Sequence, residues 1–113
     1  MNTGTEPMKI YRGYKVSPGP CRVTVSEGGT TWNLDPRNDL RDHSPDGFNF
    51  GYEGSGPAQL ALAMLAEHLQ NDEEALRWYQ YFKRALIARL NGDWQLTTDQ
   101  IEAVMVHIRA GTE

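Results

Sequence analysis

Residues 54–69 read Gly-Ser-Gly-Pro-Ala-Gln-Leu-Ala-Leu-Ala-Met-Leu-Ala-Glu-His-Leu, and this stretch decides how the rest of the chain is arranged. Pro57 suits the first position of a helix, where no N–H is needed, and Gly56 or Ser55 can cap that helix. The first two turns after Pro57 are apolar on nearly every side. Such a helix must be covered on most of its surface. We therefore predict a central helix over residues 57–69, with the other elements packed around it.

The residues before this helix alternate between apolar and polar side chains, which is typical of β-strands. Gly28-Gly29 is a turn that closes a hairpin, Gly13 suits a bulge, and residues 17–20 form another turn. Residues 35–43 are a polar loop. Strands are predicted over residues 8–16, 21–26, 30–34 and 47–52.

The residues after the central helix predict two more helices. Asn71-Asp72-Glu73-Glu74 caps the first, and Asn91-Gly92 ends it. Thr97-Thr98-Asp99-Gln100 is a capping box that begins the second. The first of these helices carries an apolar stripe at helical spacing, formed by Ala75, Tyr79, Phe82, Leu86 and Leu90.

The order of these elements predicts an α+β fold, with a small antiparallel sheet of about four strands followed by three helices packed on one face. Residues 1–7 are polar, and we expect them to form a disordered N-terminal tail. Residues 8–113 are expected to form one domain, because 113 residues match the usual size of a single domain.

Composition excludes several classes of protein. Cys21 is the only cysteine, so no disulfide can form within the chain and no zinc site can be built from cysteines. The net charge is −4 and no Lys/Arg-rich run occurs, which argues against nucleic acid as the partner. The longest apolar run, residues 60–66, is too short to span a bilayer, and no signal peptide is visible. We expect a cytoplasmic protein without a cofactor.

Residues 43–63 carry a distinctive pattern: Ser-Pro-Asp-Gly-Phe, an aromatic residue two positions later, Gly-Tyr, a glycine-rich turn, Gly-Pro and Gln-Leu-Ala. This pattern resembles the signature of an uncharacterised bacterial and phage domain family, and Tyr11-Arg12-Gly13 and residues 79–83 fit its flanks. Phe50 and Glu53 depart from the family pattern, which has tryptophan and glycine there. The resemblance implies a single small domain with an accessory role in phages, plasmids or other mobile elements. It transfers no catalytic residues.

The loop between the fourth predicted strand and the central helix is one candidate site. Free N–H groups at a helix start can hold a phosphate or a carboxylate, although no Lys or Arg occurs over residues 42–70. Gln59 either caps the helix or contacts a ligand, and the cap is favoured. The residues of this candidate ligand site, for an anion or a nucleotide, are His43, Asp46, Tyr52, Ser55, Gly56 and Gln59.

The sequence supports metal binding and catalysis less than it supports the candidate ligand site. Residues 42–53 match the spacing of a calcium loop, but that loop requires a helix on both sides, so we expect no calcium site. His43, Ser44, Asp46 and Ser55 supply the groups of a hydrolytic triad without a nucleophile-elbow motif. The sequence therefore predicts no catalytic residues and no enzyme.

The second predicted helix offers a candidate protein-binding surface. Trp78 and Tyr81 lie three positions apart beside the apolar stripe, and Arg77 and Arg84 flank them. Tyr, Trp and Arg are common anchors of protein interfaces; the alternative is that both rings join the core. We predict a non-enzymatic accessory or inhibitory protein that binds another protein, with a homodimer and antagonism of a host defence system as open possibilities. The alternative function is a small-ligand domain built on residues 43–59.

Overall fold

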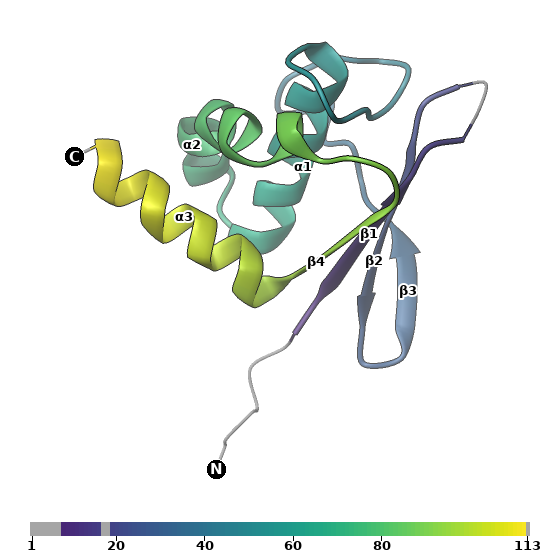
Figure 1. The fold of residues 1–113 in the computed structure, drawn as a ribbon, viewed down its shortest axis with the longest axis horizontal. Coiled ribbons are helices and arrows are strands. Elements are labelled where there is room, and N and C mark those ends of the chain that lie inside the picture. Colours follow the sequence, from purple (N-terminus) through teal and green to yellow (C-terminus); the bar gives the residue numbers. More distant parts are fainter. Residues whose placement is uncertain (1–7, 17–18, 113) are drawn as a thin grey trace.

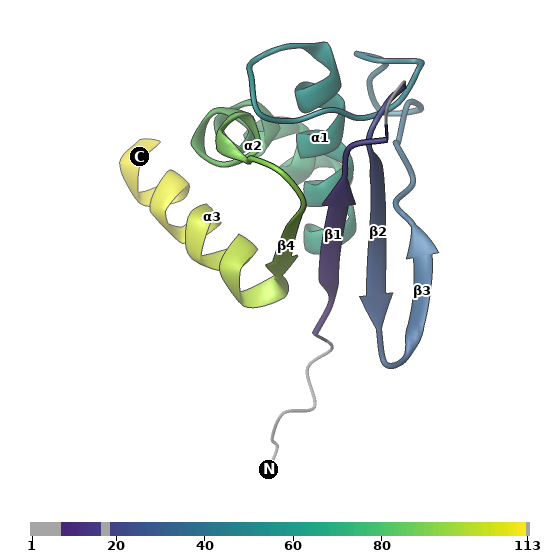
Figure 2. The same ribbon diagram turned by 45° about the vertical axis from the view of Figure 1, so that its right-hand side comes forward.

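The computed structural model describes residues 8–16 and 19–112. A four-stranded antiparallel sheet lies on one side of the molecule, and the three helices lie on the other (Figures 1 and 2). This confirms the predicted fold class. The predicted tail, residues 1–7, and two residues of the predicted turn, 17–18, lie outside the described residues.

The sheet has the order β3-β2-β1-β4. Its strands are β1 (Ile10–Tyr14), β2 (Arg22–Glu27), β3 (Thr30–Asn33) and β4 (Trp94–Thr97). Strand β1 pairs with β2 on one side and with β4 on the other, so the first strand is joined to the last across most of the chain. Tyr11, Val25 and Leu96 turn their side chains into the core.

The fourth strand is not where the sequence predicts it. Residues 47–52 form an irregular segment whose one bridge joins Phe48 to Cys21, with 3.1 Å between Cys21 N and Phe48 O. Gly47 and Gly51 have φ angles of +121° and +87°, which interrupt an extended strand. Phe48 and Phe50 are nevertheless buried. The alternating apolar residues of this segment therefore mark side chains that enter the core, although the segment forms no ladder of strand hydrogen bonds.

Gly13 is not a bulge, because residues 10–14 pair in continuous register with both neighbouring strands. Its missing side chain leaves room for the indole of Trp94 on β4. A Cβ atom at Gly13 would lie 2.3 Å from Trp94 ring atoms. This close approach is the physical reason for a glycine in the middle of the central strand.

Helix α1 (Ser55–Leu69) is the buried central element that the sequence predicts. Residues 56–66 are buried without interruption, and α1 packs against α2 (Asp72–Ala85). The predicted cap of α2 is confirmed, since the Asn71 side chain accepts a hydrogen bond from Glu74 N at 3.1 Å.

Helix α2 ends at Ala85, before the predicted end of its apolar stripe. The chain turns at Leu86 and continues as a short 3₁₀ helix, η1 (Ile87–Arg89). Ile87 is fully buried there, and its carbonyl accepts a hydrogen bond from Gly51 N at 3.0 Å. The turn therefore fixes the irregular 47–52 segment to the end of α2.

Helix α3 (Thr98–Thr112) follows β4 directly. The predicted capping box is confirmed: Thr97 N donates to Gln100 Oε1 at 2.9 Å, and Gln100 N donates to Thr97 Oγ1 at 3.3 Å. Ile101, Met105 and Ile108 bury one face of α3. No helix among the described residues is long and apolar enough to cross a membrane.

Candidate functional site

The polar loop over residues 35–46 is held on α1 by a single buried amide. Gln59 is fully buried, and its Oε1 accepts hydrogen bonds from His43 N at 2.7 Å and Ser44 N at 3.1 Å. Its Nε2 donates to Pro36 O at 2.6 Å and Arg41 O at 3.0 Å. These four contacts use both hydrogens and both lone pairs of the amide.

This geometry corrects the prediction for Gln59. The N-cap of α1 is Gly54 and receives no side-chain hydrogen bond, so Gln59 is not a cap. Its amide has no hydrogen-bonding capacity left for a ligand either. Gln59 instead fixes the backbone of the loop.

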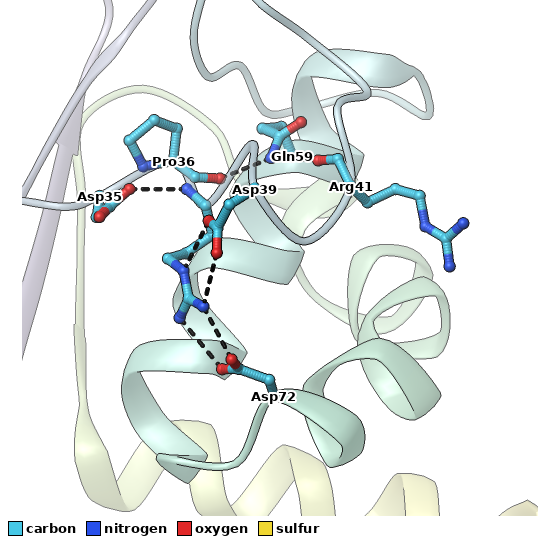
Figure 3. Close-up of polar contacts among 7 residues, drawn as sticks. Asp35, Pro36, Asp39, Arg41, Gln59 and Asp72 are labelled. Atoms are coloured by element: carbon cyan, nitrogen blue, oxygen red, sulfur yellow. Dashed lines mark hydrogen bonds and ion pairs between the residues drawn. The ribbon is translucent and has the colours of Figure 1, made fainter.

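Arg37 ties the same loop to the start of α2 (Figure 3). Its backbone is left-handed, with φ of +54°, and its N–H donates to Asp35 Oδ1 at 2.9 Å. The guanidinium donates to both carboxylate oxygens of Asp72, at 2.9 and 3.2 Å, and to those of Asp39, at 3.0 and 3.1 Å. These hydrogen bonds lower the pKa of the Asp39 carboxyl below its usual range. The loop is therefore fixed to both α1 and α2.

His43, a predicted ligand residue, makes a second contact of the loop with α2. Its Nε2 lies 2.6 Å from Tyr79 Oη. Burial lowers the pKa of His43, and the charges of Arg41 and Lys83 lower it further. A neutral imidazole bonded to a buried tyrosine braces the loop.

The other four predicted ligand residues come together. Asp46, Tyr52, Ser55 and Gly56 line a pocket of about 230 Å³ at the start of α1. Ser44 and Asn49 add to its polar lining, and no Lys or Arg of the described residues lines it. The pocket thus offers hydroxyl, amide and backbone groups together with one carboxylate.

Two acidic residues of the calcium-loop pattern, residues 42–53, make other contacts in the structure. Asp42 accepts a hydrogen bond from Asn38 at 3.0 Å, and Glu53 lies beside Lys83 and Arg84. Within residues 8–16 and 19–112, no three His, Cys, Asp or Glu side chains form a group that could hold a metal ion.

The predicted partner residues on α2 separate into one buried and three exposed positions. Trp78 is only 5% exposed, and its Nε1 donates to Glu74 Oε1 at 3.2 Å. This corrects the expectation of an exposed Trp78, because the wide apolar stripe of α2 includes its ring. Tyr81 is 44% exposed, and its ring centroid lies 5.8 Å from that of Trp78.

Arg77 and Arg84 flank Tyr81 on the solvent side of α2, and the three positions are spaced i, i+4 and i+7 on one helical stripe. The Arg77 guanidinium carbon lies 4.9 Å from the Trp78 ring centroid, within the range of a cation–π contact. We call Arg77, Tyr81 and Arg84 the α2 surface. The buried Trp78 ring contacts both Tyr81 and Arg77 of this surface.

A family of unknown function (DUF6166) matches residues 11–107. The chain belongs to this family. No curated protein and no solved structure matches the chain. The match extends from β1 into α3 and therefore includes the loop, the pocket and the α2 surface. Family membership supports the predicted uncharacterised domain; the specific signature and a bacterial or phage origin stay predictions.

Sequence reasoning missed four residues that organise this part of the molecule: Arg37, Arg41, Glu53 and Lys83. Nothing in the local sequence indicates that Arg37 reaches Asp72, because that contact depends on how the loop crosses α1. A signal for the cations was present, since residues 75–92 contain Arg77, Lys83, Arg84 and Arg89 but no Asp or Glu. Whether each of these cations forms an ion pair or stays exposed depends on the residues that the fold brings next to it.

Proposed function

We propose that this protein acts without catalysis, by binding another protein through the α2 surface. The observation that carries the proposal is the exposure of Tyr81, an aromatic side chain 44% open to solvent between two exposed arginines. Tyr and Arg are enriched among the residues that contribute most to protein interfaces. Neither has an evident role in the folding of α2, whose buried residues are Ala75, Trp78, Tyr79 and Phe82.

The α2 surface is also preorganised. Asn71 caps its helix, and Arg37 fixes the first turn through Asp72. The ring of Trp78 limits where Tyr81 and Arg77 can lie. Side chains that are ordered before binding lose less conformational entropy when a partner arrives. This supports a binding role for a surface of only three residues.

The finer form of the proposal is an accessory or inhibitory protein of a phage or another mobile element, with antagonism of a host defence system as one form of that role. Its support is the resemblance carried by residues 43–63. Plating phages on host strains with and without the gene tests it: protection of the phages from a defence system supports the role, and unchanged plating across defended strains contradicts it.

A photo-cross-linking residue placed at position 81 tests the binding role directly. We expect a discrete cross-linked product in cells of the native host. Val106 on α3 is the matched control, because it is an exposed apolar residue on another helix. Products at position 81 that equal those at position 106 would contradict the proposal. Melting curves of both variants confirm that the fold is retained.

The pocket at the start of α1 supports a second candidate, the binding of a small anion or nucleotide. The observation in its favour is that four of the six predicted ligand residues line one pocket of about 230 Å³. Against it stand the carboxylate of Asp46 and the lack of a basic side chain in the lining. An NMR titration with inorganic phosphate and with ATP tests this function. Saturable shifts of the Ser55 and Gly56 amides would support it, and unchanged amides would exclude these ligands.

A further inference from the structure

Five basic residues lie on α2, on the 3₁₀ helix that follows it or on the polar loop beside it, in a protein whose net charge is −4. We call them the cationic surface: Arg41, Arg77, Lys83, Arg84 and Arg89. Four of them come from residues 75–92, and Arg89 Nε lies 3.3 Å from the carbonyl oxygen of Arg84.

The fold adds Arg41 from the polar loop. His43 fixes the loop to α2 through Tyr79, at 2.6 Å, and the charges of Arg41 and Lys83 both act on His43. Figure 3 shows the Arg41 side chain directed away from Asp39 and Asp72, and its guanidinium forms no ion pair within residues 8–16 and 19–112. Arg41 is thus available to a partner next to α2.

Glu53 marks a position where a carboxylate of the chain lies beside this surface. Its Oε1 lies 3.8 Å from Lys83 Nζ and 3.7 Å from Arg84 Nε, and its side chain is 60% exposed. These distances are too long for hydrogen bonds. Among the described residues, neither cation donates a side-chain hydrogen bond. The Arg84 side chain is 58% exposed, so its donors remain free for an incoming carboxylate, whereas the Lys83 side chain is only 12% exposed and contributes mainly its charge.

We infer that the cationic surface binds a short acidic segment of a partner protein, with Tyr81 packing against that segment. This inference rests on the proposed binding function and adds the chemistry of the partner. Charge complementarity supports it, because among the described residues the five cations have only Glu53 and Glu74 at ion-pair distance. Arg77 and Arg84 are about 10 Å apart along the helix, which equals about three residues of an extended segment.

A long polyanion fits less well. The first turn of α2 carries Asp72, Glu73 and Glu74, so an anion that followed the helix beyond Arg77 would meet acidic residues. The surface therefore favours a segment with a few carboxylates over a continuous phosphate backbone. Nucleic-acid binding draws its affinity from many phosphate contacts, which a surface of this size cannot supply.

An NMR titration of the full chain tests this inference, with three probes of ten units each: a glutamate-rich peptide, an uncharged Ser/Gly peptide and decathymidylate. We expect saturable shifts at residues 77–89 with the acidic peptide alone. Arg84→Glu should weaken binding at least fivefold, since an exposed ion pair contributes up to about 1 kcal/mol and a reversed charge adds repulsion. Glu53→Gln should tighten it, because the competing carboxylate is removed.

Arg22→Glu is the matched control. Arg22 is exposed on β2, and its side chain forms no hydrogen bond or ion pair within the described chain, so the variant makes the same charge change elsewhere. We expect its affinity to fall less than twofold, and melting curves check that each variant folds. Equal losses in Arg22→Glu and Arg84→Glu would overturn the inference, as would a lack of saturable shifts or equal binding of decathymidylate.

The two proposals can fail separately. If the partner cross-linked at position 81 has no acidic segment and the glutamate-rich peptide does not bind, the protein-binding function stands and the acidic-partner inference is wrong. If position 81 captures nothing while the peptide binds with the expected variant pattern, the charge recognition stands and the proposed function is wrong.

Discussion

Replacing Gln59 with leucine should destabilise the protein by about 2–4 kcal/mol. The side chain makes four hydrogen bonds to loop backbone, each contributing about 0.5–1.5 kcal/mol. Leucine has nearly the same volume, so no large cavity opens in α1. The expected loss lies in the lower half of the summed range, because part of the loop can rebind water once it separates from α1.

Urea unfolding measures the change in the free energy of unfolding, and amide hydrogen exchange locates it. The His43 and Ser44 amides donate to Gln59, so both should lose protection in the leucine variant. In the same variant, the protection of the β1 and β2 amides should fall only by the amount that the change in the global free energy of unfolding predicts.

Gln95→Leu is the matched control. Gln95 is exposed on β4, and its Oε1 accepts one hydrogen bond from Arg12 at 3.1 Å. We expect a change within about 0.5 kcal/mol, as for most surface substitutions. A loss below about 1 kcal/mol for Gln59→Leu, with protection of His43 and Ser44 unchanged, would refute the idea that this amide fixes the loop.

Three further predictions follow from the packing and from one pKa shift. Trp78→Ala should cost about 3–5 kcal/mol of stability, while Tyr81→Ala should cost less than about 1 kcal/mol, both measured by urea unfolding. Gly13→Val should destabilise by at least about 2 kcal/mol and change the fluorescence of Trp94, because a Cβ atom there meets the indole. The pKa of His43 is lower in the folded protein than the ordinary histidine value of 6.5, so His43 contributes stability above pH 6.5 that is lost as the pH falls through its folded pKa. His43→Gln should therefore lose less stability on acidification than the wild type.

Equal losses for the two aromatic variants would mean that Tyr81 is as important to the core as Trp78. Gly111→Ala is the control for Gly13, since nothing lies within 4 Å of the added Cβ atom. His107→Gln, which replaces an exposed histidine of α3, is the control for the effect of acid on stability. If the wild type and His43→Gln respond alike to acid, His43 does not carry the effect.

Local patterns predicted the elements whose signals act within a few residues. The Asn71 cap of α2 and the Thr97–Gln100 capping box both form as expected, because each bonds residues three positions apart. The apolar composition of residues 57–66 predicted a central helix correctly, because burial is the only way to stabilise such a surface.

The fourth strand could not be assigned locally. Residues 47–52 and 94–97 both place apolar residues at alternate positions, and only one segment pairs with β1. The choice depends on the space beside Gly13, which admits the Trp94 indole. Likewise, Trp78 and Tyr81 are both aromatic neighbours on α2, and the position of the stripe relative to α1 decides which one is buried.

By itself, the sequence determined the α+β class, the buried α1 helix, the caps of α2 and α3, and the pair of arginines around Tyr81. All of these follow from patterns among residues that lie close together in the chain. Only the tertiary structure decided that Gln59 and Arg37 fix the polar loop, and that Arg41, Glu53 and Lys83 join one surface. The contacts of Gln59 with the loop, of Arg37 with Asp72 and of Glu53 with Lys83 join residues 15 to 35 positions apart, so they exist only after the core has packed and brought the loop onto α1 and α2.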